Sequence, residues 1–542
     1  MTTVADLLLA RRGDNRVGLV FDDESWTYDE YVSESMRRAA YLATTLRSDH
    51  EPHVGVLLDN TPEFCFWLGG AALLGATVVG INPTRRGDDL ARDIAHTECQ
   101  LFVTESRHRE LLDELGLGLP LFDVDADGDL PETSGDVESR DVSDETRYLL
   151  LFTSGTTAAP KAVICSQGRL ARIADVIVDR FELTPDDVCY GVMPMFHGNA
   201  LMTSWAPALA AGATLALRRK FSASGFLPDV RRFGATYFNY VGRPLAYILA
   251  TPEQPDDADN PLRRAFGNEA GAVDVAAFEK RFDCVIQEGY GSSEGGAAIN
   301  RTPETPPAAL GPAPDGVVIL SQDSGEECAL ALFDETGRLL NADDAVGEIV
   351  NITGAVGFEG YWRNPEAMQT RIQGTAYWTG DLGYRDTQGF IYFAGRADDW
   401  IRVDGENIAA TPIEQILLRH PDVIGAVVYA VPDPRVGDLV MAAIELRDGT
   451  SFDAASFDKF LVEQPDLGTK MAPTFVRIVD AIPATATLKP VRRDLRREAW
   501  TCTDPVWWRP TRDDAYRLLT DDDVATIAMT FKDHRRERLL PE

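Results

Sequence analysis

The chain has 542 residues and a mass of 59.5 kDa, which is too long for one simple hydrophobic core and predicts two or three domains. Hydrophobic residues make up 44% of the sequence and charged residues 25%, a composition that excludes wholesale disorder, collagen and a polytopic membrane protein. The formal net charge of −34 argues against nucleic-acid binding, because phosphate backbones require Lys and Arg, but it leaves a local site for a small anion open.

Neither the cysteines nor the histidines form a recognisable pattern. The seven cysteines contain no CxxC pair and the seven histidines are scattered, so we expect neither a disulfide framework nor a zinc module. The N-terminus offers only the apolar stretch Leu7–Ala10, which is too short for a signal sequence. These features predict a protein of the reducing cytoplasm.

One nearly charge-free run, residues 64–82, is about as long as a membrane span. It contains Gly69 and Gly70 and then the β-branched residues 77–79. We therefore predict a closely packed small-residue helix followed by a buried strand, and we leave a peripheral contact with the inner face of a membrane open.

Apolar, β-rich runs alternate with longer amphipathic stretches over roughly the first 290 residues. The clearest of these runs are Val54–Leu58, Thr77–Ile81, Leu101–Thr104 and Leu149–Phe152. The alternation predicts an α/β fold of layered, mainly parallel sheets.

Two loops interrupt this pattern. Asp123–Glu145 is acidic and reads as an exposed loop, and Thr302–Gly316 carries five prolines. Shorter strands and turns follow, with a hairpin expected at Glu335–Arg338, and they predict a small β-rich subdomain. From about residue 400 the α/β pattern returns on a smaller scale.

The strongest local signal is the segment Thr153–Lys161, which directly follows a buried strand. Its hydroxyl groups, its glycine and its lysine suit an anion, because backbone N–H groups and hydroxyls donate to phosphate oxygens while Lys supplies a point charge. The spacing differs from that of a Walker A loop. An ordinary Ser/Thr-rich turn is the alternative interpretation.

Three further segments carry polar groups suited to a nucleotide. Glu288–Gly296 lacks the spacing of a dinucleotide fingerprint, but a carboxylate in such a Gly/Ser loop suits Mg²⁺ beside phosphates. In Tyr377–Asp381 and Ala394–Asp399, an Asp on a turn can accept bonds from a ribose diol and an Arg can reach a phosphate. Taken alone, each of the last two is more typical of a capped turn.

Together and in this order, TSGTT…PK, YGSSE, TGD, GRADD and a late Lys resemble the adenylate-forming superfamily of acyl-CoA synthetases, firefly luciferases and adenylation domains. Arg219–Ser224, Tyr240–Gly242, Phe266–Asn268, Trp400–Asn407 and the tail from Asp504 look like the very-long-chain acyl-CoA synthetase branch, which includes the fatty-acid transport proteins. The resemblance spans essentially the whole chain and implies an acyl-CoA synthetase. The low Lys content and the high Arg and Ala content fit a bacterial chain.

The resemblance implies a reaction in two halves. A carboxylate attacks the α-phosphate of ATP to give an acyl-adenylate and pyrophosphate, and the thiol of CoA then displaces AMP. The β- and γ-phosphates would be held by Thr153, Ser154, Gly155, Thr156, Thr157 and Lys161. The rest of the nucleotide would be bordered by Gly267, Asn268, Gly289, Tyr290, Gly291, Ser292, Ser293, Asp381 and Arg396.

Within that set, the resemblance gives Ser293 a contact with the α-phosphate and Asp381 the ribose hydroxyls, with Arg396 near both ribose and phosphate. Glu294 would bind Mg²⁺. His197 lies in the motif that borders the acyl pocket and would orient the substrate carboxylate, although a structural histidine that caps a loop is an equal alternative.

Lys489 matches the lysine that bridges carboxylate and α-phosphate during adenylation, where an ammonium stabilises charge that develops between two anions. The resemblance implies an N-terminal adenylation domain at residues 1–397 and a small mobile α+β domain at 398–542, with Asp398 as the hinge. After rotation the loop with Gly405, Glu406 and Asn407 would serve the CoA step.

Four residues depart from the family pattern. Ala158 and Ala162 replace glycines and would stiffen the phosphate loop. Leu488 replaces the glycine before the lysine, as a bulky residue does in the very-long-chain branch, and Pro490 follows it. None of these changes removes a required charge.

The branch implies a large apolar acid, either a long or very long fatty acid or a steroid side-chain acid, and the sequence does not rank the two. Three other functions share some of the motifs: a fatty acyl-AMP ligase without the CoA step, a luciferase-like oxygenase, and a non-catalytic acyl-binding or uptake scaffold. Lys161, Glu294, Asp381, Arg396 and Lys489 are all present, and this argues against the scaffold.

Overall fold

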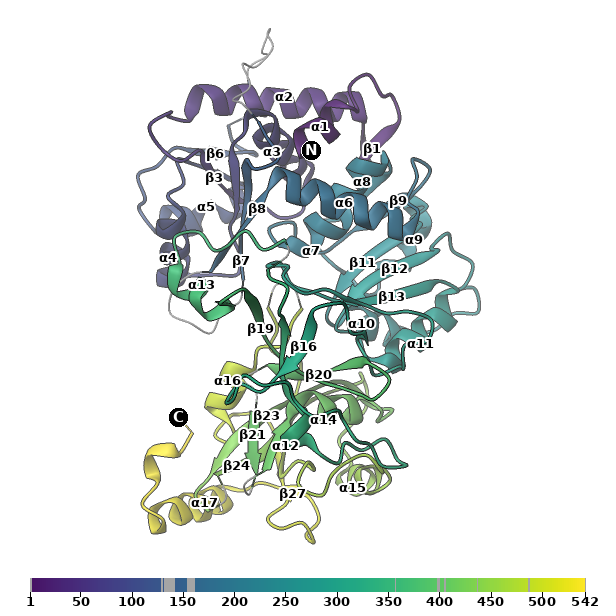
Figure 1. Ribbon diagram of the computed structural model, residues 1–542, viewed down its shortest axis with the longest axis vertical. Coiled ribbons are helices and arrows are strands. Elements are labelled where there is room, and N and C mark those ends of the chain that lie inside the picture. Colours follow the sequence, from purple (N-terminus) through teal and green to yellow (C-terminus); the bar gives the residue numbers. More distant parts are fainter. Residues whose placement is uncertain are drawn as a thin grey trace.

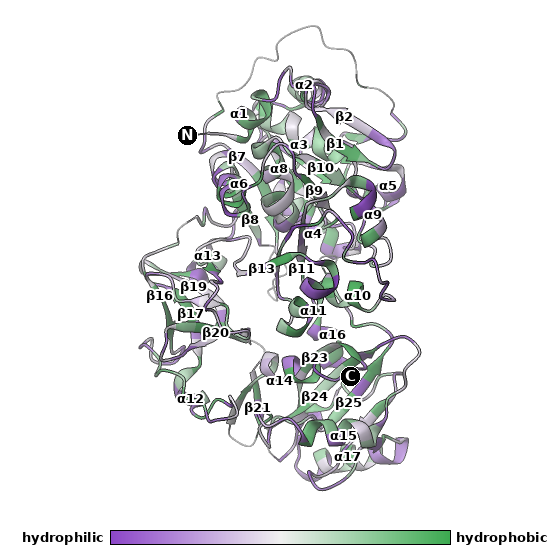
Figure 2. Ribbon diagram, turned by 90° about the vertical axis from the view of Figure 1, so that its right-hand side faces the viewer, coloured by the Kyte–Doolittle hydropathy of each residue, from purple (hydrophilic) through white to green (hydrophobic). Residues whose placement is uncertain are grey.

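The computed structural model describes residues 2–127, 130, 142–153, 161–355, 357–396, 400–403, 406–435, 437–485 and 488–541. A large α/β domain forms one end of the molecule, a β-rich subdomain packs at its side, and a small α/β domain forms the other end (Figures 1 and 2). The predicted fold class, layered α/β sheets with a β-rich subdomain and a small C-terminal domain, is confirmed.

Two sheets form the large domain. The first has the strand order β14-β13-β12-β11-β9-β10-β1-β2. Its strands are β1 (Val17–Phe21), β2 (Glu24–Thr27), β9 (Val188–Gly191), β10 (Thr214–Leu217), β11 (Tyr237–Val241), β12 (Arg264–Asn268), β13 (Val285–Tyr290) and β14 (Ile299–Asn300). The strands from β1 to β13 are parallel to their neighbours along this path, and only the edge strands β2 and β14 are antiparallel.

The second sheet has the order β6-β5-β3-β4-β7-β8. Its strands are β3 (His53–Leu57), β4 (Thr77–Gly80), β5 (Leu101–Thr104), β6 (Leu121–Asp123), β7 (Arg147–Phe152) and β8 (Ala162–Ser166). The four predicted apolar runs are β3, β4, β5 and β7, and they pair in parallel as expected. Both faces of these strands are covered, which is why they read as continuous apolar runs.

Helices cover the faces of these sheets. They are α1 (Val4–Leu9), α2 (Tyr28–Thr45), α3 (Pro62–Leu74), α4 (Gly87–Thr97), α5 (Ser106–Asp113), α6 (Gln167–Phe181), α7 (Gly198–Ala200), a π-helical turn (Leu201–Trp205), α8 (Ala206–Ala211), α9 (Phe226–Phe233), α10 (Pro244–Leu249) and α11 (Ala272–Phe282). Most strands of these sheets are coloured hydrophobic in Figure 2, whereas helices such as α5 and α9 carry hydrophilic stretches.

The charge-free run at residues 64–82 is α3 followed by β4, as predicted, and both are buried. A Cβ atom on Gly70 would lie 2.6 Å from the Cβ of Arg38, so this glycine lets α3 pack directly against α2. Among the described residues no helix is both long enough and apolar enough to cross a membrane. The predicted peripheral contact with a membrane stays a prediction.

The two predicted loops differ in outcome. The described part of the acidic stretch begins inside β6, which ends at Asp123. Asp123 is buried, and the Ser106 hydroxyl donates to its carboxylate, with oxygen–oxygen distances of 3.0 and 2.9 Å. Residues 128, 129 and 131–141 lie outside the described ones. The proline-rich stretch is a loop that contains only the short strand β15 (Gly311–Pro312).

The β-rich subdomain is confirmed. Its sheet has the order β15-β20-β19-β17-β16, with β16 (Val317–Leu320), β17 (Gly347–Asn351), β19 (Ala376–Arg385), β20 (Phe390–Arg396) and the added strand β18 (Ile372–Gln373). Its helices are α12 (Ala342–Ala345) and α13 (Pro365–Arg371). The predicted hairpin at Glu335–Arg338 is present, closed by a bond from the Asp334 N–H to the Arg338 carbonyl at 3.0 Å.

The small domain is built on a sheet of order β22-β21-β24-β25-β26-β27, with β23 paired to β24. Its strands are β21 (Trp400–Val403), β22 (Glu406–Ala409), β23 (Val423–Asp433), β24 (Gly437–Leu446), β25 (Phe475–Val479), β26 (Val506–Trp508) and β27 (Arg517–Leu518). Its helices are α14 (Ala410–Leu417), α15 (Ala454–Val462), α16 (Arg492–Glu498), α17 (Asp521–Asp533) and a 3₁₀ turn (Glu537–Leu539).

Candidate active site

The segment predicted to bind the triphosphate joins β7 to β8. The Thr153 N–H donates to the Lys161 carbonyl at 3.1 Å, so these two residues close the stem of an antiparallel hairpin. Ser154, Gly155, Thr156, Thr157 and Ala158 lie outside the described residues. The structure thus fixes where this loop leaves and re-enters the sheet.

The predicted ribose and phosphate groups meet where the β-rich subdomain contacts β13. Asp381 and Arg396 are register partners on β19 and β20, with the Arg396 Nε 3.3 Å from the Asp381 carboxylate. The Tyr290 hydroxyl donates to the other carboxylate oxygen at 2.8 Å. Burial raises the pKa of Asp381, and the Arg396 guanidinium opposes that rise.

Ser293 and Glu294 lie in the turn that follows β13. Arg169 donates from Nη2 to the Ser293 carbonyl at 2.7 Å and so fixes the backbone of this turn. Glu294 is buried, and the Tyr361 hydroxyl donates to its Oε1 at 3.1 Å. A carboxylate has about four lone-pair positions, so a carboxylate oriented by this single hydroxyl fits a role as a Mg²⁺ ligand beside phosphates.

The predicted adenine border is the carboxyl end of β12 and β13. Asn268 donates from its side-chain amide to the Gly289 carbonyl, and the Asn268 carbonyl accepts from the Gly242 N–H at 3.0 Å. These bonds tie the ends of three neighbouring strands together. Gly291 and Ser292 are exposed beyond them.

His197 precedes α7, and its ring contacts that of Phe196 at 4.5 Å between centroids. Burial and then the nearby Lys489 ammonium lower the pKa of His197 to about 4, so its imidazole is neutral at pH 7. The Lys489 Nζ lies 2.6 Å from the Glu269 carboxylate at the end of β12. The small domain therefore reaches the same site as the large one.

A tight turn holds Lys489. The Thr485 N–H donates to the Lys489 carbonyl at 2.8 Å, and Ala484 forms a β-bridge with Pro490. Leu488 has a φ of 60°, in the left-handed region that favours glycine, which explains why a glycine at this position would be the less strained choice. Pro490 fits the bridge without a break in the turn.

The residues predicted for the CoA step lie elsewhere. Glu406 and Asn407 belong to β22, which packs against α12 of the β-rich subdomain. Asp398 and Gly405 lie outside the described residues. In this arrangement Lys489, and not β22, belongs to the elements that surround Asp381 and His197.

Three residues at the site were missed by the sequence analysis. Glu269 pairs with Lys489, Tyr361 binds Glu294, and Arg169 fixes the turn at Ser293. Only Glu269 had a local signal, because it directly follows Asn268 at a strand end. Desolvation opposes its charge, but the Lys489 ammonium outweighs it and holds the pKa of Glu269 below its ordinary value.

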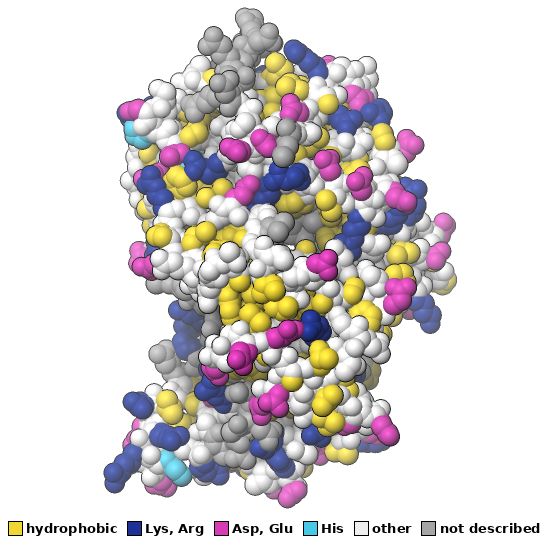
Figure 3. Space-filling view, in the orientation of Figure 1, with side chains coloured by type: hydrophobic (Ala, Val, Ile, Leu, Met, Phe, Trp, Pro, Cys, Tyr) yellow, Lys and Arg dark blue, Asp and Glu magenta, His cyan; other side chains and the backbone are white. Residues whose placement is uncertain are grey.

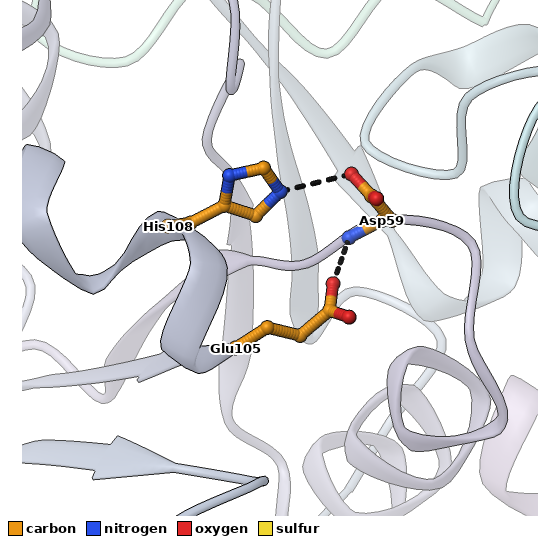
Figure 4. Close-up of side chains that lie close together, drawn as sticks. All are labelled: Asp59, Glu105 and His108. Carbon is orange, nitrogen blue, oxygen red and sulfur yellow. Dashed lines mark hydrogen bonds and ion pairs between the residues drawn. The ribbon is translucent and has the colours of Figure 1, made fainter.

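A second polar group lies at the carboxyl ends of β3 and β5. Figure 4 shows Asp59 between Glu105 and His108, and the His108 Nε2 lies 2.9 Å from the Asp59 carboxylate. Arg107 approaches Asp59 at 2.7 Å, and Arg219 pairs with both carboxylates. Guanidinium groups already neutralise this cluster, so it joins strand ends as an ion-pair network.

A cavity of about 240 Å³ lies between this network and the Lys489 turn. Asn60, Phe196, Arg219 and Leu488 are among its lining residues. Phe196 and Leu488 directly precede His197 and Lys489 in the chain, so the cavity lies next to both of these residues.

Comparison with known proteins shows the family to which this chain belongs. The profile of the AMP-binding enzyme family matches residues 9–362, and that of the AMP-binding enzyme C-terminal domain matches residues 412–489. This chain belongs to the AMP-binding enzyme family. The matches cover the strands and turns that hold Glu294, His197 and Lys489.

Two relatives match over nearly the whole chain. Steroid-22-oyl-CoA synthetase of Rhodococcus jostii is 52% identical over 549 residues, which is 99% of each protein. The medium/long-chain-fatty-acid–CoA ligase FadD17 of Mycobacterium tuberculosis is 47% identical over 508 residues, 93% of this chain and 98% of its own.

Solved structures confirm the fold alone. The anthranilate CoA ligase AuaEII in complex with anthranoyl-AMP superposes with a TM-score of 0.80 at 21% identity, over 92% of this chain and 97% of its own. ATP-bound MatB from Rhodopseudomonas palustris gives 0.78 at 22% identity, over 91% and 98%. The predicted family and fold class are confirmed, and so is an AMP-forming acid–thiol ligase that uses ATP, Mg²⁺ and CoA.

Proposed function

We propose that this family member converts a large apolar carboxylic acid to its CoA thioester, and that a steroid side-chain acid is its substrate class. The observation that carries the choice is the 52% identity to steroid-22-oyl-CoA synthetase over 99% of both chains. The alignment runs over the full length of both chains, so it spans the residues around the acyl group, wherever they lie.

Medium- or long-chain fatty acids are the second candidate. The 47% identity to the fatty-acid–CoA ligase over 93% of this chain favours them. Both candidate classes present one carboxylate on a large apolar body, so the same ATP chemistry serves either.

In the proposed first half-reaction, Lys489 lies between the substrate carboxylate and the α-phosphate. Two anions must approach each other, and an ammonium between them stabilises the charge that the transition state concentrates there. The short Lys489–Glu269 pair and the effect of Lys489 on the pKa of His197 support this position. Neutral His197 would then orient the carboxylate by a hydrogen bond rather than by charge.

Glu294 would hold Mg²⁺, which supplies neutralisation of phosphate charge. The ribose hydroxyls would bind Asp381, and Arg396 beside it would reach the phosphate. The N–H groups and hydroxyls between Thr153 and Lys161 would hold the β- and γ-phosphates.

The second half-reaction requires a different face of the small domain. We assign residues 1–397 to the adenylation domain and residues 398–542 to a mobile domain that turns about Asp398. Rotation would withdraw Lys489 and present Gly405, Glu406 and Asn407 to the CoA thiol. One site cannot hold pyrophosphate and the CoA arm at once, and a two-state hinge resolves that conflict.

The experiment that tests the proposal measures CoA-dependent AMP formation from ATP over a panel of acids, with product masses recorded. The panel runs from short to very long fatty acids and includes steroid side-chain acids. A steroid-acyl thioester is the expected product. Thioesters of fatty acids alone would move the substrate class to the second candidate. Adenylate without thioester would indicate an acyl-AMP ligase. Absence of pyrophosphate exchange with every acid would indicate a scaffold.

A further inference from the structure

One side chain of the large domain is inserted into the small domain. Arg243 follows β11 and precedes α10, and its guanidinium is largely buried at 12% exposure. Its Nη1 lies 3.0 Å from the Glu445 carboxylate on β24, and its Nη2 donates to the Ile424 carbonyl at 3.1 Å. Arg243 and Glu445 are 202 residues apart in sequence, so this buried ion pair joins two domains.

The small domain is shaped to receive this guanidinium. Gly425 on β23 is the register partner of Glu445 on β24, and a Cβ atom at position 425 would overlap the guanidinium of Arg243. Only glycine at this position leaves room for the group. The two strands therefore form a recess for the guanidinium, in which Gly425 leaves space and the Glu445 carboxylate lies beside that space. We call this recess the seat.

The seat is linked to Lys489 by the backbone. The same Glu445 oxygen that binds Arg243 accepts the Ile482 N–H at 3.0 Å, and Ile482 begins the segment that leads to Lys489. On the other side, a Cβ atom on Gly242, next to Arg243, would lie 3.0 Å from the Leu488 carbonyl. Arg243 thus lies between two contacts with the stretch of chain that carries Lys489.

A buried ion pair inside one domain provides the comparison. Arg281 and Asp257 form such a pair, at 8% and 3% exposure, within the large domain. The Arg243–Glu445 pair is nearly as well buried, at 12% and 7%, but joins two bodies that the two half-reactions require to move. This inference rests on the proposed function, because only a two-step ligase needs the contact to open.

We infer that Arg243 is a positioning residue that, seated on Gly425 and paired with Glu445, holds the small domain in the orientation that places Lys489 at the site. The guanidinium leaves this seat when the small domain turns for the CoA step. Removal of one partner of a buried ion pair is strongly unfavourable to the state that contains it, so loss of Arg243 lowers the population of the adenylation orientation.

The kinetic test uses Arg243→Ala and Gly425→Ala. The second variant keeps every charge and expels the guanidinium by steric overlap alone. For both, acid-dependent ATP–pyrophosphate exchange should fall about tenfold or more, because the competent orientation becomes a minor state. Thioesterification of a supplied acyl-adenylate should be retained, and Arg243→Lys, which can still reach Glu445, should restore part of the exchange.

The matched control is Arg281→Ala, which breaks a buried pair inside one domain. It should lower stability and affect both half-reactions alike. If Arg243→Ala and Gly425→Ala affected both half-reactions alike as well, with the fold intact, the positioning role would be wrong.

A distance measurement tests the same inference without any acid. Spin labels on Val176→Cys in the large domain and Val462→Cys in the small domain, both exposed positions, report domain orientation in a background with Cys328→Ser and Cys502→Ser. The parent should show one main distance, and Arg243→Ala and Gly425→Ala should each add a second population. An unchanged distribution in both variants would overturn the inference, even if no acid tested were a substrate.

Discussion

The side chains at the site alternate in charge. Lys489 and Arg396 supply positive charge, and Glu269 and Asp381 oppose each of them at short range. In a chain of net charge −34, this local balance lets a triphosphate and a carboxylate approach a protein whose overall field repels both. We propose that the chemistry of the first step depends most on Lys489, whose ammonium would lie between the two reacting anions.

Lys489→Ala should reduce carboxylate-dependent ATP–pyrophosphate exchange by about a hundredfold or more, as removal of a transition-state donor commonly does. Thioesterification of a supplied acyl-adenylate should be largely retained, since the second step uses another face of the small domain. Lys459→Ala is the control, because Lys459 is an exposed lysine of the same domain whose partner is Glu463 on its own helix. Equal loss of both half-reactions in a folded Lys489→Ala protein would contradict the two-face account.

His197 should stay neutral well below pH 7. Burial and the Lys489 charge lower its pKa to about 4, below the value near 6.5 that it has in an unfolded chain. The neutral ring therefore stabilises the fold above about pH 6.5, and this contribution is lost as the pH falls toward 4. NMR titration of labelled histidine, with His197→Gln to assign the signal, should show protonation near pH 4. A midpoint near pH 6.5 would contradict this prediction and show that the ring is solvated and partly charged near neutral pH.

At the scale of elements, one row of residues crosses three neighbouring parallel strands near the candidate site. Tyr240 on β11, Gly267 on β12 and Glu288 on β13 are register partners, and the Tyr240 side chain crosses Gly267 to donate its hydroxyl to Glu288. A Cβ atom on Gly267 would overlap the tyrosine ring. Burial raises the pKa of Glu288 to about 7. A buried carboxyl without a hydrogen-bond partner is costly, and the Tyr240 hydroxyl supplies that partner.

Gly267→Ala should therefore displace the Tyr240 ring and open the adenine border. We expect a loss of about 1–3 kcal/mol of stability from overpacking, and a weaker affinity for ATP measured by calorimetry. Tyr240→Phe is the companion variant, because it keeps the ring in place and removes only the hydroxyl bond, at a cost of about 1–3 kcal/mol for the carboxyl left without it. Wild-type ATP affinity in Gly267→Ala would remove these strand ends from the proposed adenine site.

Much of this architecture follows from local pattern. The runs at 54–58, 77–81, 101–104 and 149–152 became strands because they are buried on both faces, and apolar composition alone reveals that. Asp123 was expected in a loop but ends β6, since its neighbour Phe122 pairs with β5 and composition carries no information on pairing. Of the described residues that directly follow this strand, 125–127 are exposed, whereas Leu130 is buried.

The candidate site likewise contains residues that could be predicted from the sequence and residues that could not. The positions of Asp381 and Arg396 could be predicted because each belongs to a short motif, and their pairing follows from the β19–β20 register. The partner of Lys489, Glu269, could not be predicted, because they are 220 residues apart and meet only through domain packing. The same holds for Arg243 and Glu445: contacts across a domain interface leave no periodicity in the sequence.

At the scale of the whole molecule, the arrangement is the one that we propose for the first half-reaction. Lys489 pairs with Glu269 while β22 packs against α12, so the two parts of the small domain that we assign to the two half-reactions contact different elements. Between β20, which ends at Arg396, and β21, which begins at Trp400, the chain has only three residues in which to turn. Asp398 is the middle one.

Asp398→Pro tests that hinge. A proline ring fixes φ near −65° and thereby removes one of the rotations available to so short a connection. Overall turnover should fall sharply while one half-reaction, measured by itself, survives, because the domain is held in one orientation. Asp398→Ala is the control: it deletes the side chain but leaves φ free, so it should turn over nearly as the parent does. Unaltered turnover in Asp398→Pro would place the pivot elsewhere in the chain. Equal loss of turnover in both variants would mean that the reaction requires the carboxylate of Asp398 rather than its backbone rotation.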